Sequence, residues 1–225
     1  MNENPSNNSR SRRRRQRLLN HLFLSVISVG ATVGLYFGLT IPYPSESGWI
    51  FRWSLSTAYV AAVLLAATLT IGAWNVFRRG SSPLSIDLRR DVGIWCGLLA
   101  IAHTLVGLNV HMKNWTQYFV DDAGSPRTDF FGLANYLGVL AAVIVIALLA
   151  TSNDLSLKIL KSRSWKRVQR WSYVFAALTA IHALLYVAVE KRFVPYLFIL
   201  AGLIAWVLAV QFAGVLKKGA NYFDG

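Results

Sequence analysis

Apolar residues in this chain fall into six long blocks, separated by short polar or charged segments. The blocks cover roughly residues 21–40, 56–77, 91–110, 131–150, 168–189 and 193–215. Each is about 20 residues long, the length that a helix needs to cross the ~30 Å hydrocarbon core of a bilayer. None alternates strictly between apolar and polar positions as a membrane β-strand does. Because only helices and closed barrels satisfy their backbone groups in lipid, the pattern predicts six transmembrane helices.

The composition agrees with an all-α integral membrane protein, since 55% of the 225 residues are hydrophobic. We expect a disordered polybasic tail over residues 1–20, a six-helix bundle over 21–218 and a short tail over 219–225. Little chain is left for a soluble flavin or nucleotide domain, so such chemistry is expected from a partner. The single cysteine, Cys96, excludes an intramolecular disulfide and is interpreted as a small buried apolar residue.

The net charge of +13 would suggest nucleic acid as the partner of a soluble protein, but here the cations gather in particular segments. Residues 10–17, 78–90 and 158–170 are basic, whereas the loop 112–129 is slightly acidic. By the positive-inside rule, both termini are cytoplasmic. The basic segments therefore predict contacts with an anionic lipid bilayer and no nucleic acid. Residues 154–166 mix cations with apolar residues, which suggests an amphipathic segment on the inner surface.

Two histidines lie deep inside predicted helices. His103 is thirteen residues beyond Arg90, and His182 is twelve beyond Arg170. At about 1.5 Å per residue, both imidazoles lie roughly 18–20 Å from the inner boundary. An ionisable side chain at membrane depth is a functional hypothesis by default. Two neutral imidazoles at one depth suit the axial ligands of a b-type heme, whereas the alternative is that they only hydrogen-bond neighbouring helices.

Small residues near the two histidines could make room for a macrocycle or could only allow helices to pack closely. They are Gly97, Ala100, Gly107, Ala176, Ala180 and Ala183. The remaining polar groups are interpreted as surface features: interfacial His21 and His111, an exposed turn at Glu190, and a solvated acidic loop containing Asp121, Asp122 and Asp129.

An ordered set of motifs between about residues 85 and 190 resembles the ferric reductase-like transmembrane domain family. The likeness is strongest to the heme-binding membrane subunits of bacterial methionine sulfoxide reductase systems. The motifs are Arg89-Arg90-x-x-Gly93-Ile94-Trp95-Cys96 followed by His103, then Thr151-Ser152, then Trp165-Lys166-Arg167-Val168-Gln169-Arg170 followed by Tyr173 and His182.

The resemblance implies a b-type heme subunit that carries electrons across the membrane, with the heme iron bound by His103 and His182. Relatives with two hemes have further histidines where this chain has Gln169 and the Arg89-Arg90 pair. We therefore expect one heme b per chain. The donor would be a cytoplasmic flavin reductase or quinol. The acceptor would be an extracytoplasmic methionine sulfoxide reductase subunit, ferric iron or oxygen.

Such a chain would be an oxidoreductase component that needs a partner, with no catalytic acid, base or nucleophile of its own. A multi-pass protein of the cell (inner) membrane is expected, with an internal photosynthetic membrane as the alternative. A heme in the outer half lies far from a cytoplasmic donor, so a second carrier is expected. We predict FMN or a quinone near a group of cationic, amide and aromatic side chains. These are Arg89, Arg90, Trp95, Arg167, Gln169 and Arg170. The alternative is that the arginines only fix topology.

A rival function is a heme-free transporter or assembly factor with structural histidines. Transporters usually contain broken helices or acidic residues near the midplane of the membrane. The predicted helices that contain His103 and His182 have neither feature. This difference favours the redox function.

Overall fold

The computed structural model describes residues 5–43, 48–77, 86–111, 114–190 and 194–223. These residues form helices, and no β-strand occurs among them apart from one isolated bridge between Val120 and Pro126. In chain order the elements are α1 (Pro5–Gly38), α2 (Trp49–Phe77), α3 (Ile86–Gly107), the 3₁₀ helix η2 (Trp115–Tyr118), α4 (Phe130–Ala150), α5 (Asp154–Gln169), α6 (Trp171–Glu190) and α7 (Val194–Phe223).

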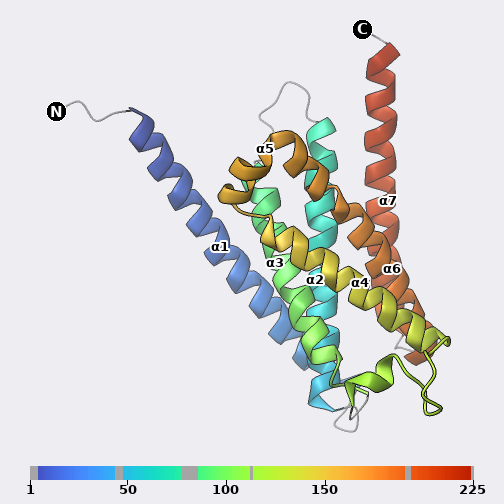
Figure 1. The fold of residues 1–225 in the computed structure, drawn as a ribbon. Coiled ribbons are helices and arrows are strands. Elements are labelled where there is room, and N and C mark those ends of the chain that lie inside the picture. The colour runs from blue at the N-terminus through green and yellow to red at the C-terminus, as the bar shows by residue number, and fades with distance from the viewer. Residues whose placement is uncertain (1–4, 44–47, 78–85, 112–113, 191–193, 224–225) are drawn as a thin grey trace.

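The long helices stand side by side as a bundle, with α2 and α3 packed together near its centre (Figure 1). Helix α1 contacts α2 and α3 and leans away from the bundle towards its own N-terminus. Helix α1 begins, and α7 ends, at the end of the bundle that holds α5. We call this the basic end, and we call the opposite end, which holds η2, the loop end. That both termini face the cytoplasm stays a prediction.

Within the described ranges, five stretches are long and apolar enough to cross a membrane: Arg14–Gly38, Trp49–Phe77, Phe130–Ala150, Asp154–Glu190 and Tyr196–Lys217. The all-α membrane class is therefore confirmed. Helix α3 is not among the five, because charges in its first turns and His103 lower its hydropathy. It nevertheless lies within the bundle, against α2 and α4. The count of six spanning helices stays a prediction, with α3 as the sixth.

Helix boundaries differ from the expected ones at both ends of the chain. Helix α1 begins at Pro5, inside the segment 1–20 for which a disordered tail is expected, and that division of the chain stays a prediction. Arginine and glutamine are good helix formers, and extending an existing helix costs far less than nucleating one. Helix α7 likewise continues to Phe223. The amphipathic segment expected at 154–166 is the helix α5.

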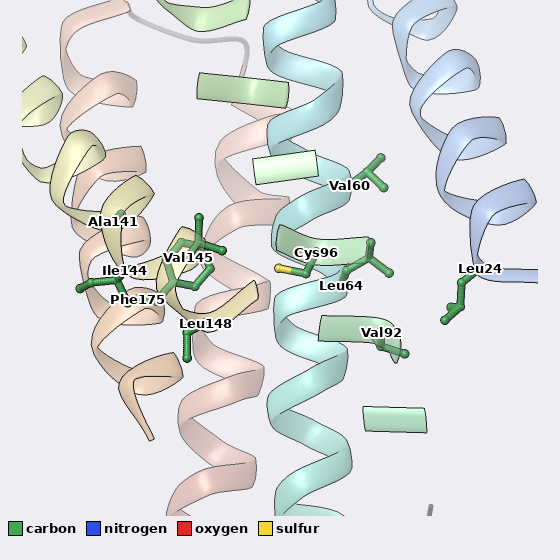
Figure 2. Packing of buried hydrophobic residues seen from close by; sticks show 10 residues of the cluster. All are labelled: Leu24, Val60, Leu64, Val92, Cys96, Ala141, Ile144, Val145, Leu148 and Phe175. Atoms are coloured by element: carbon green, nitrogen blue, oxygen red, sulfur yellow. The ribbon is translucent and has the colours of Figure 1, made fainter. Parts of the chain in front are cut away.

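The main apolar cluster joins four helices of the bundle to α1 (Figure 2). Val60 and Leu64 of α2 lie in the same cluster as Val92 and Cys96 of α3. Cys96 is 3% exposed, and its thiol donates to the carbonyl of Ala61 at 3.4 Å, which confirms its interpretation as a small buried residue. The close packing of α2 on α3 fixes the helix that holds His103.

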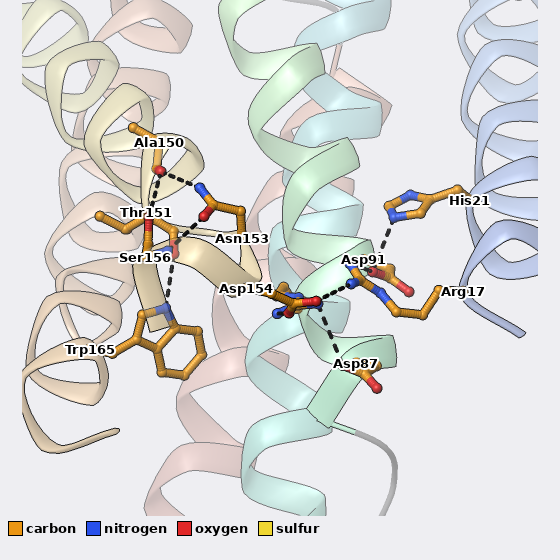
Figure 3. Close-up of polar contacts among 11 residues, drawn as sticks. Arg17, His21, Asp87, Asp91, Ala150, Thr151, Asn153, Asp154, Ser156 and Trp165 are labelled. Carbon is orange, nitrogen blue, oxygen red and sulfur yellow. Dashed lines mark hydrogen bonds and ion pairs between the residues drawn. The ribbon is translucent and has the colours of Figure 1, made fainter. Parts of the chain in front are cut away.

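An ion-pair network, buried at Asp91 and Arg90 and exposed at Asp154, ties α1, α3 and α5 together at the basic end (Figure 3). Asp91 of α3 is fully buried, and its Oδ1 lies 3.2 Å from both Arg17 Nη2 and His21 Nε2 of α1. Asp154, at the start of α5, lies 2.7 Å from Arg90 Nη1 and 3.6 Å from Arg17 Nη1. The solvated interfacial role expected for His21 is wrong, since its imidazole faces a buried carboxylate.

Replacing Asp91 by alanine should loosen α1. The change leaves Arg17 and His21 without their shared carboxylate, and breaking a buried ion pair costs about 3–5 kcal/mol. We expect a loss at the low end of that range, because Arg17 still contacts Asp154 in the variant. Thermal unfolding in detergent would measure the loss, and trypsin should cut faster after the arginines of α1. The exposed Asp122→Ala is the control, with a change of about 0.5 kcal/mol or less. Equal melting temperatures for Asp91→Ala and Asp122→Ala would contradict the role of Asp91 in holding α1.

The N-terminus of α4 is capped by Asp129. Its carboxylate accepts from the backbone N–H of Gly132 at 2.8 Å and from Arg127 Nη2 at 3.1 Å. The Arg127 guanidinium, followed by the Gly132 N–H, holds the pKa of Asp129 below its ordinary value. A lowered pKa in the folded state stabilises the fold above the ordinary pKa, and this stabilisation disappears as the pH falls through the folded value.

Asp129→Ala should lower the free energy of unfolding by about 1 kcal/mol at neutral pH, because the cap is lost. Asp129→Asn keeps a good capping side chain and loses only the ion pair, so its effect should be smaller. The difference between wild type and Asp129→Asn should shrink once the pH falls below about 3.9, the ordinary pKa of aspartate. Chemical unfolding over a pH series tests this, and a difference that grows on acidification would refute the account.

Candidate functional site

The structure brings His103 of α3 and His182 of α6 together. Their ring centroids lie 6.2 Å apart, and their ring planes meet at 75°. The two residues are far apart in the sequence, and each is held by a different neighbouring helix. The pairing across the bundle is therefore a product of the fold.

Both imidazoles are oriented by main-chain carbonyls. His103 Nδ1 lies 2.9 Å from the carbonyl oxygen of Ser54 on α2, and His182 Nδ1 lies 2.8 Å from that of Ala134 on α4. A carbonyl can only accept, so each Nδ1 carries a proton, and the neutral form of each ring then has its lone pair on Nε2. The Ser54 hydroxyl, 3.2 Å from His103 Nδ1, lies at the same ring nitrogen. In metal-binding histidines, the ring nitrogen that does not bind the metal usually donates its N–H to a carbonyl, a carboxylate or water.

The separation of the rings is of the size expected when two imidazoles bind one metal ion. A metal–imidazole bond is about 2.0 Å long, and the ring centre lies about 1.1 Å behind the nitrogen, which gives roughly 6 Å between opposed rings. The observed 6.2 Å agrees with this sum. In the described ranges, no group of three or more His, Cys, Asp or Glu gathers as a metal cage. A heme iron needs only two axial protein ligands, so the pair suffices for that class of cofactor.

Both histidines line a cavity of about 690 Å³ within the bundle. This volume falls in the usual range for cofactor pockets, about 300–1,000 Å³. Most of the small residues expected to make room lie on its wall: Ala100, Gly107, Ala176, Ala180 and Ala183. Gly97 has a different role, because a Cβ there would lie 2.7 Å from Cγ of Leu149. It allows close packing of α3 on α4.

Helix α4 supplies a second layer of contacts that the sequence analysis missed. Gly138 lies against the His182 ring, and a Cβ at this position would lie 2.9 Å from both Cε1 and Nδ1 of that ring. The Tyr186 ring is centred 5.0 Å from that of His182, and its hydroxyl donates to Asn135 Oδ1 at 2.7 Å. Asn135 is a buried amide inside an apolar helix, which is a signal that sequence reasoning could have used.

His111 and Glu190 lie at the loop end of the same cavity. His111 Nε2 and Glu190 Oε1 are 2.7 Å apart, and the His111 ring is stacked with Tyr186 at 6.2 Å between centroids. The Glu190 side chain is only 12% exposed, so its interpretation as an exposed turn is wrong. Helix α6 extends to this residue and turns the carboxylate towards His111.

The residues predicted to hold FMN or a quinone do not line the cavity. On α3, Arg90 is paired with Asp154, the Arg89 guanidinium lies against Gly72 of α2, and Trp95 packs beside the main apolar cluster. On the other side, Gln169 Nε2 donates to Thr151 Oγ1 at 3.3 Å. Arg167 and Arg170 are exposed. A carrier bound by this set stays a prediction.

A helical membrane bundle that brings two imidazoles together at a largely apolar cavity is suited to bind a cofactor between its helices. Residues 54–180 match the family model of the ferric reductase like transmembrane component. The match covers more than half of the chain and includes most of the helix residues around the cavity. The chain therefore belongs to the ferric reductase-like transmembrane family.

Curated relatives make the relationship more specific. The chain is 30% identical over 158 residues to the protein-methionine-sulfoxide reductase heme-binding subunit MsrQ of Pectobacterium atrosepticum, over 68% of this chain and 72% of the relative. It is 27% identical over 168 residues to the subunit of the same name from Yersinia pseudotuberculosis, over 72% and 74% of the two chains. No solved structure matches the chain.

Adding a methyl group beside His182 should disturb its position. Gly138→Ala pushes the ring off the Ala134 carbonyl, and overpacking of this kind costs about 1–3 kcal/mol. Gly107→Ala is the matched control, since its Cβ would meet Ser54 Oγ at 3.4 Å and His103 Cε1 at 3.9 Å. Thermal unfolding in detergent should show a clear loss for Gly138→Ala and a smaller one for Gly107→Ala. The reverse order would refute the tight fit around His182.

Proposed function

We propose that this protein is a b-type heme membrane subunit that transfers electrons across the membrane to an extracytoplasmic acceptor. The observation that carries the proposal is the opposed pair His103 and His182, 6.2 Å apart, with both Nδ1 atoms on main-chain carbonyls. Membership of the ferric reductase-like family and the heme-binding relatives support the same function.

In this proposal His103 and His182 hold one heme b through their Nε2 atoms. A bound heme supplies one-electron chemistry at the iron. The protein supplies the fixed orientation of both rings through the Ser54 and Ala134 carbonyls, and the clearance for His182 at Gly138.

We infer one heme per chain, because two of the four histidines already have other partners. The chain has four, and His21 faces Asp91 while His111 faces Glu190. Gln169, at the end of α5, donates to Thr151. Among the histidines of the described residues, His103 and His182 are therefore the pair suited to be the two axial ligands of a heme.

The proposal includes a donor and an acceptor that belong to other molecules. The donor is a cytoplasmic flavin reductase or quinol. The acceptor is a methionine sulfoxide reductase subunit, ferric iron or oxygen. The relatives are named as subunits of a protein-methionine-sulfoxide reductase, which favours a reductase subunit as the acceptor. The chain then works as the membrane part of an oxidoreductase, in the cell membrane.

Absorption spectroscopy of the purified protein tests this function. Wild type should show a low-spin b-type spectrum with one heme per chain, and His103→Ala or His182→Ala should abolish that spectrum. His111→Ala is the matched control and should retain it, because His111 is paired with Glu190 at the loop end. A colourless wild type produced with sufficient heme would support the heme-free transporter or assembly factor instead. Two hemes per chain would show that a second site exists.

A further inference from the structure

His111 and Glu190 form an ionisable pair on the wall of the cavity that contains His103 and His182. Their Nε2 and Oε1 atoms lie 2.7 Å apart, at the loop end. On the described wall of this cavity they are the only carboxylate and the only further histidine, and no lysine or arginine lines it. Imidazole and carboxylate groups can change charge near neutral pH, whereas the tyrosines and the cysteine of the wall ordinarily do so at higher pH. Neither member of the pair holds the heme in the proposed function.

We propose that the His111–Glu190 pair binds a proton when the heme is reduced and releases it when the heme is oxidised. This inference rests on the proposed function and adds a proton-binding site to it. Reduction adds one negative charge to a largely apolar cavity, where an uncompensated charge is costly. A proton gained by the pair compensates that charge.

Hydrogen bonds and a stacked ring hold the pair in place. The His111 backbone N–H donates to the Tyr118 hydroxyl at 2.9 Å, and this hydroxyl donates to the Gly107 carbonyl at 3.0 Å. The planes of the His111 and Tyr186 rings differ by only 21°. Tyr186 is itself fixed, because its hydroxyl donates to Asn135 Oδ1 at 2.7 Å. The pair therefore keeps one position on the cavity wall.

The Tyr186 ring lies between the pair and the heme ligand His182. Its centroid is 5.0 Å from that of His182 and 6.2 Å from that of His111. The His111 and His182 rings are therefore at most about 11 Å apart. At an effective dielectric constant of ~20, two unit charges at that separation change each other's equilibria by about tenfold. By linkage, the bound proton favours reduction of the heme by the same factor as reduction favours the proton.

Water at the loop end can supply the proton through His111. The His111 side chain is 31% exposed, whereas that of Glu190 is 12% exposed. Without the extra proton, the pair is a neutral imidazole that donates from Nε2 to the carboxylate, with a net charge of −1. With a proton also on Nδ1 it is an imidazolium–carboxylate pair with no net charge. The 2.7 Å contact stabilises both forms, because Nε2 donates to Oε1 in each.

Other described groups around the pair are neutral or already paired. Tyr118 and Tyr186 present a hydroxyl and a ring, and the Phe131 ring of α4 meets His111 edge-on. The Arg127 guanidinium lies 5.1 Å from the centre of the Phe131 ring, and it is paired with Asp129. The other charged residues of this part of the sequence are Asp121 and Asp122, which are exposed, and Lys113, Lys191 and Arg192, which lie outside the described residues.

The step balances in charge and in protons. In molecules that start without the extra proton, the donor gives one electron to the ferric heme, and one proton passes from loop-end water to His111. The acceptor then removes the electron, and the proton returns to the same water. No proton crosses the membrane, and no bond other than the N–H bond of His111 forms or breaks.

Redox titration of the full-length protein in nanodiscs tests the coupling through the heme spectrum. From about pH 5 to about pH 9, the equilibrium constant for reduction of the wild type should fall by about tenfold, or about 59 mV in midpoint potential. The double variant His111→Phe/Glu190→Gln should show a fall of less than about threefold, because neither group remains to bind the proton. Glu190→Gln alone should move the fall to lower pH, since the imidazolium loses its carboxylate.

Matched controls separate this coupling from other effects of charge. Asp122→Asn removes an exposed carboxylate at the loop end. His21→Gln removes the histidine that faces Asp91 at the basic end. Both controls should keep the wild-type fall in the same pH range.

Infrared difference spectra of the reduced and oxidised protein give a direct readout of the proton. The wild type should show an imidazole signal that shifts in D₂O and is absent from the double variant. A wild-type potential that does not change with pH, or a double variant that keeps the wild-type fall, would overturn the proton-binding site while leaving the proposed function intact. A wild type that binds no heme would overturn the proposed function, and this inference with it.

Discussion

The architecture depends on two hydrogen bonds from imidazole N–H groups to main-chain carbonyls. A membrane interior offers no water to an unpaired N–H, so each histidine must find an acceptor within the protein. A helix carbonyl has a second lone pair beyond the one used in the helical ladder, and Ser54 and Ala134 use it in this way. These bonds couple α3 to α2 and α6 to α4. The orientation of the two rings is therefore set by which helices are neighbours.

Polar groups elsewhere in the bundle are separated by purpose and by depth. The formal charges Asp91, Asp154 and Arg90 lie at the basic end, where they hold helices together. Neutral hydrogen-bonding groups such as Asn135 and Tyr186 surround His182, where a full charge would be costly. An apolar cluster that includes Val92 and Cys96 lies between these layers. Close ionisable pairs thus lie at both ends of the bundle, Asp91 and Asp154 at the basic end and His111–Glu190 at the loop end, with the apolar cluster and the neutral groups around His182 between them.

Much of this fold could be predicted from the sequence because hydrophobic block length is a strong signal in membrane proteins. The helical class followed from block positions, whereas the pairing of His103 with His182 was predicted from their equal depth together with the family resemblance. The carbonyls of Ser54 and Ala134 could not be predicted, because backbone acceptors have no sequence signature. Glu190 and His21 were misjudged for a related reason. Their position near a helix end suggests exposure, whereas their partners His111 and Asp91 come from distant parts of the chain.

Asp91 also bears on where the first helix lies. Arg17 and His21 are four residues apart, so they lie on one face of α1, and both contact the same carboxylate oxygen. A shift of α1 along its axis by one turn, or its rotation away from α3, would break both contacts together. One buried carboxylate on α3 therefore fixes both the height and the rotation of α1.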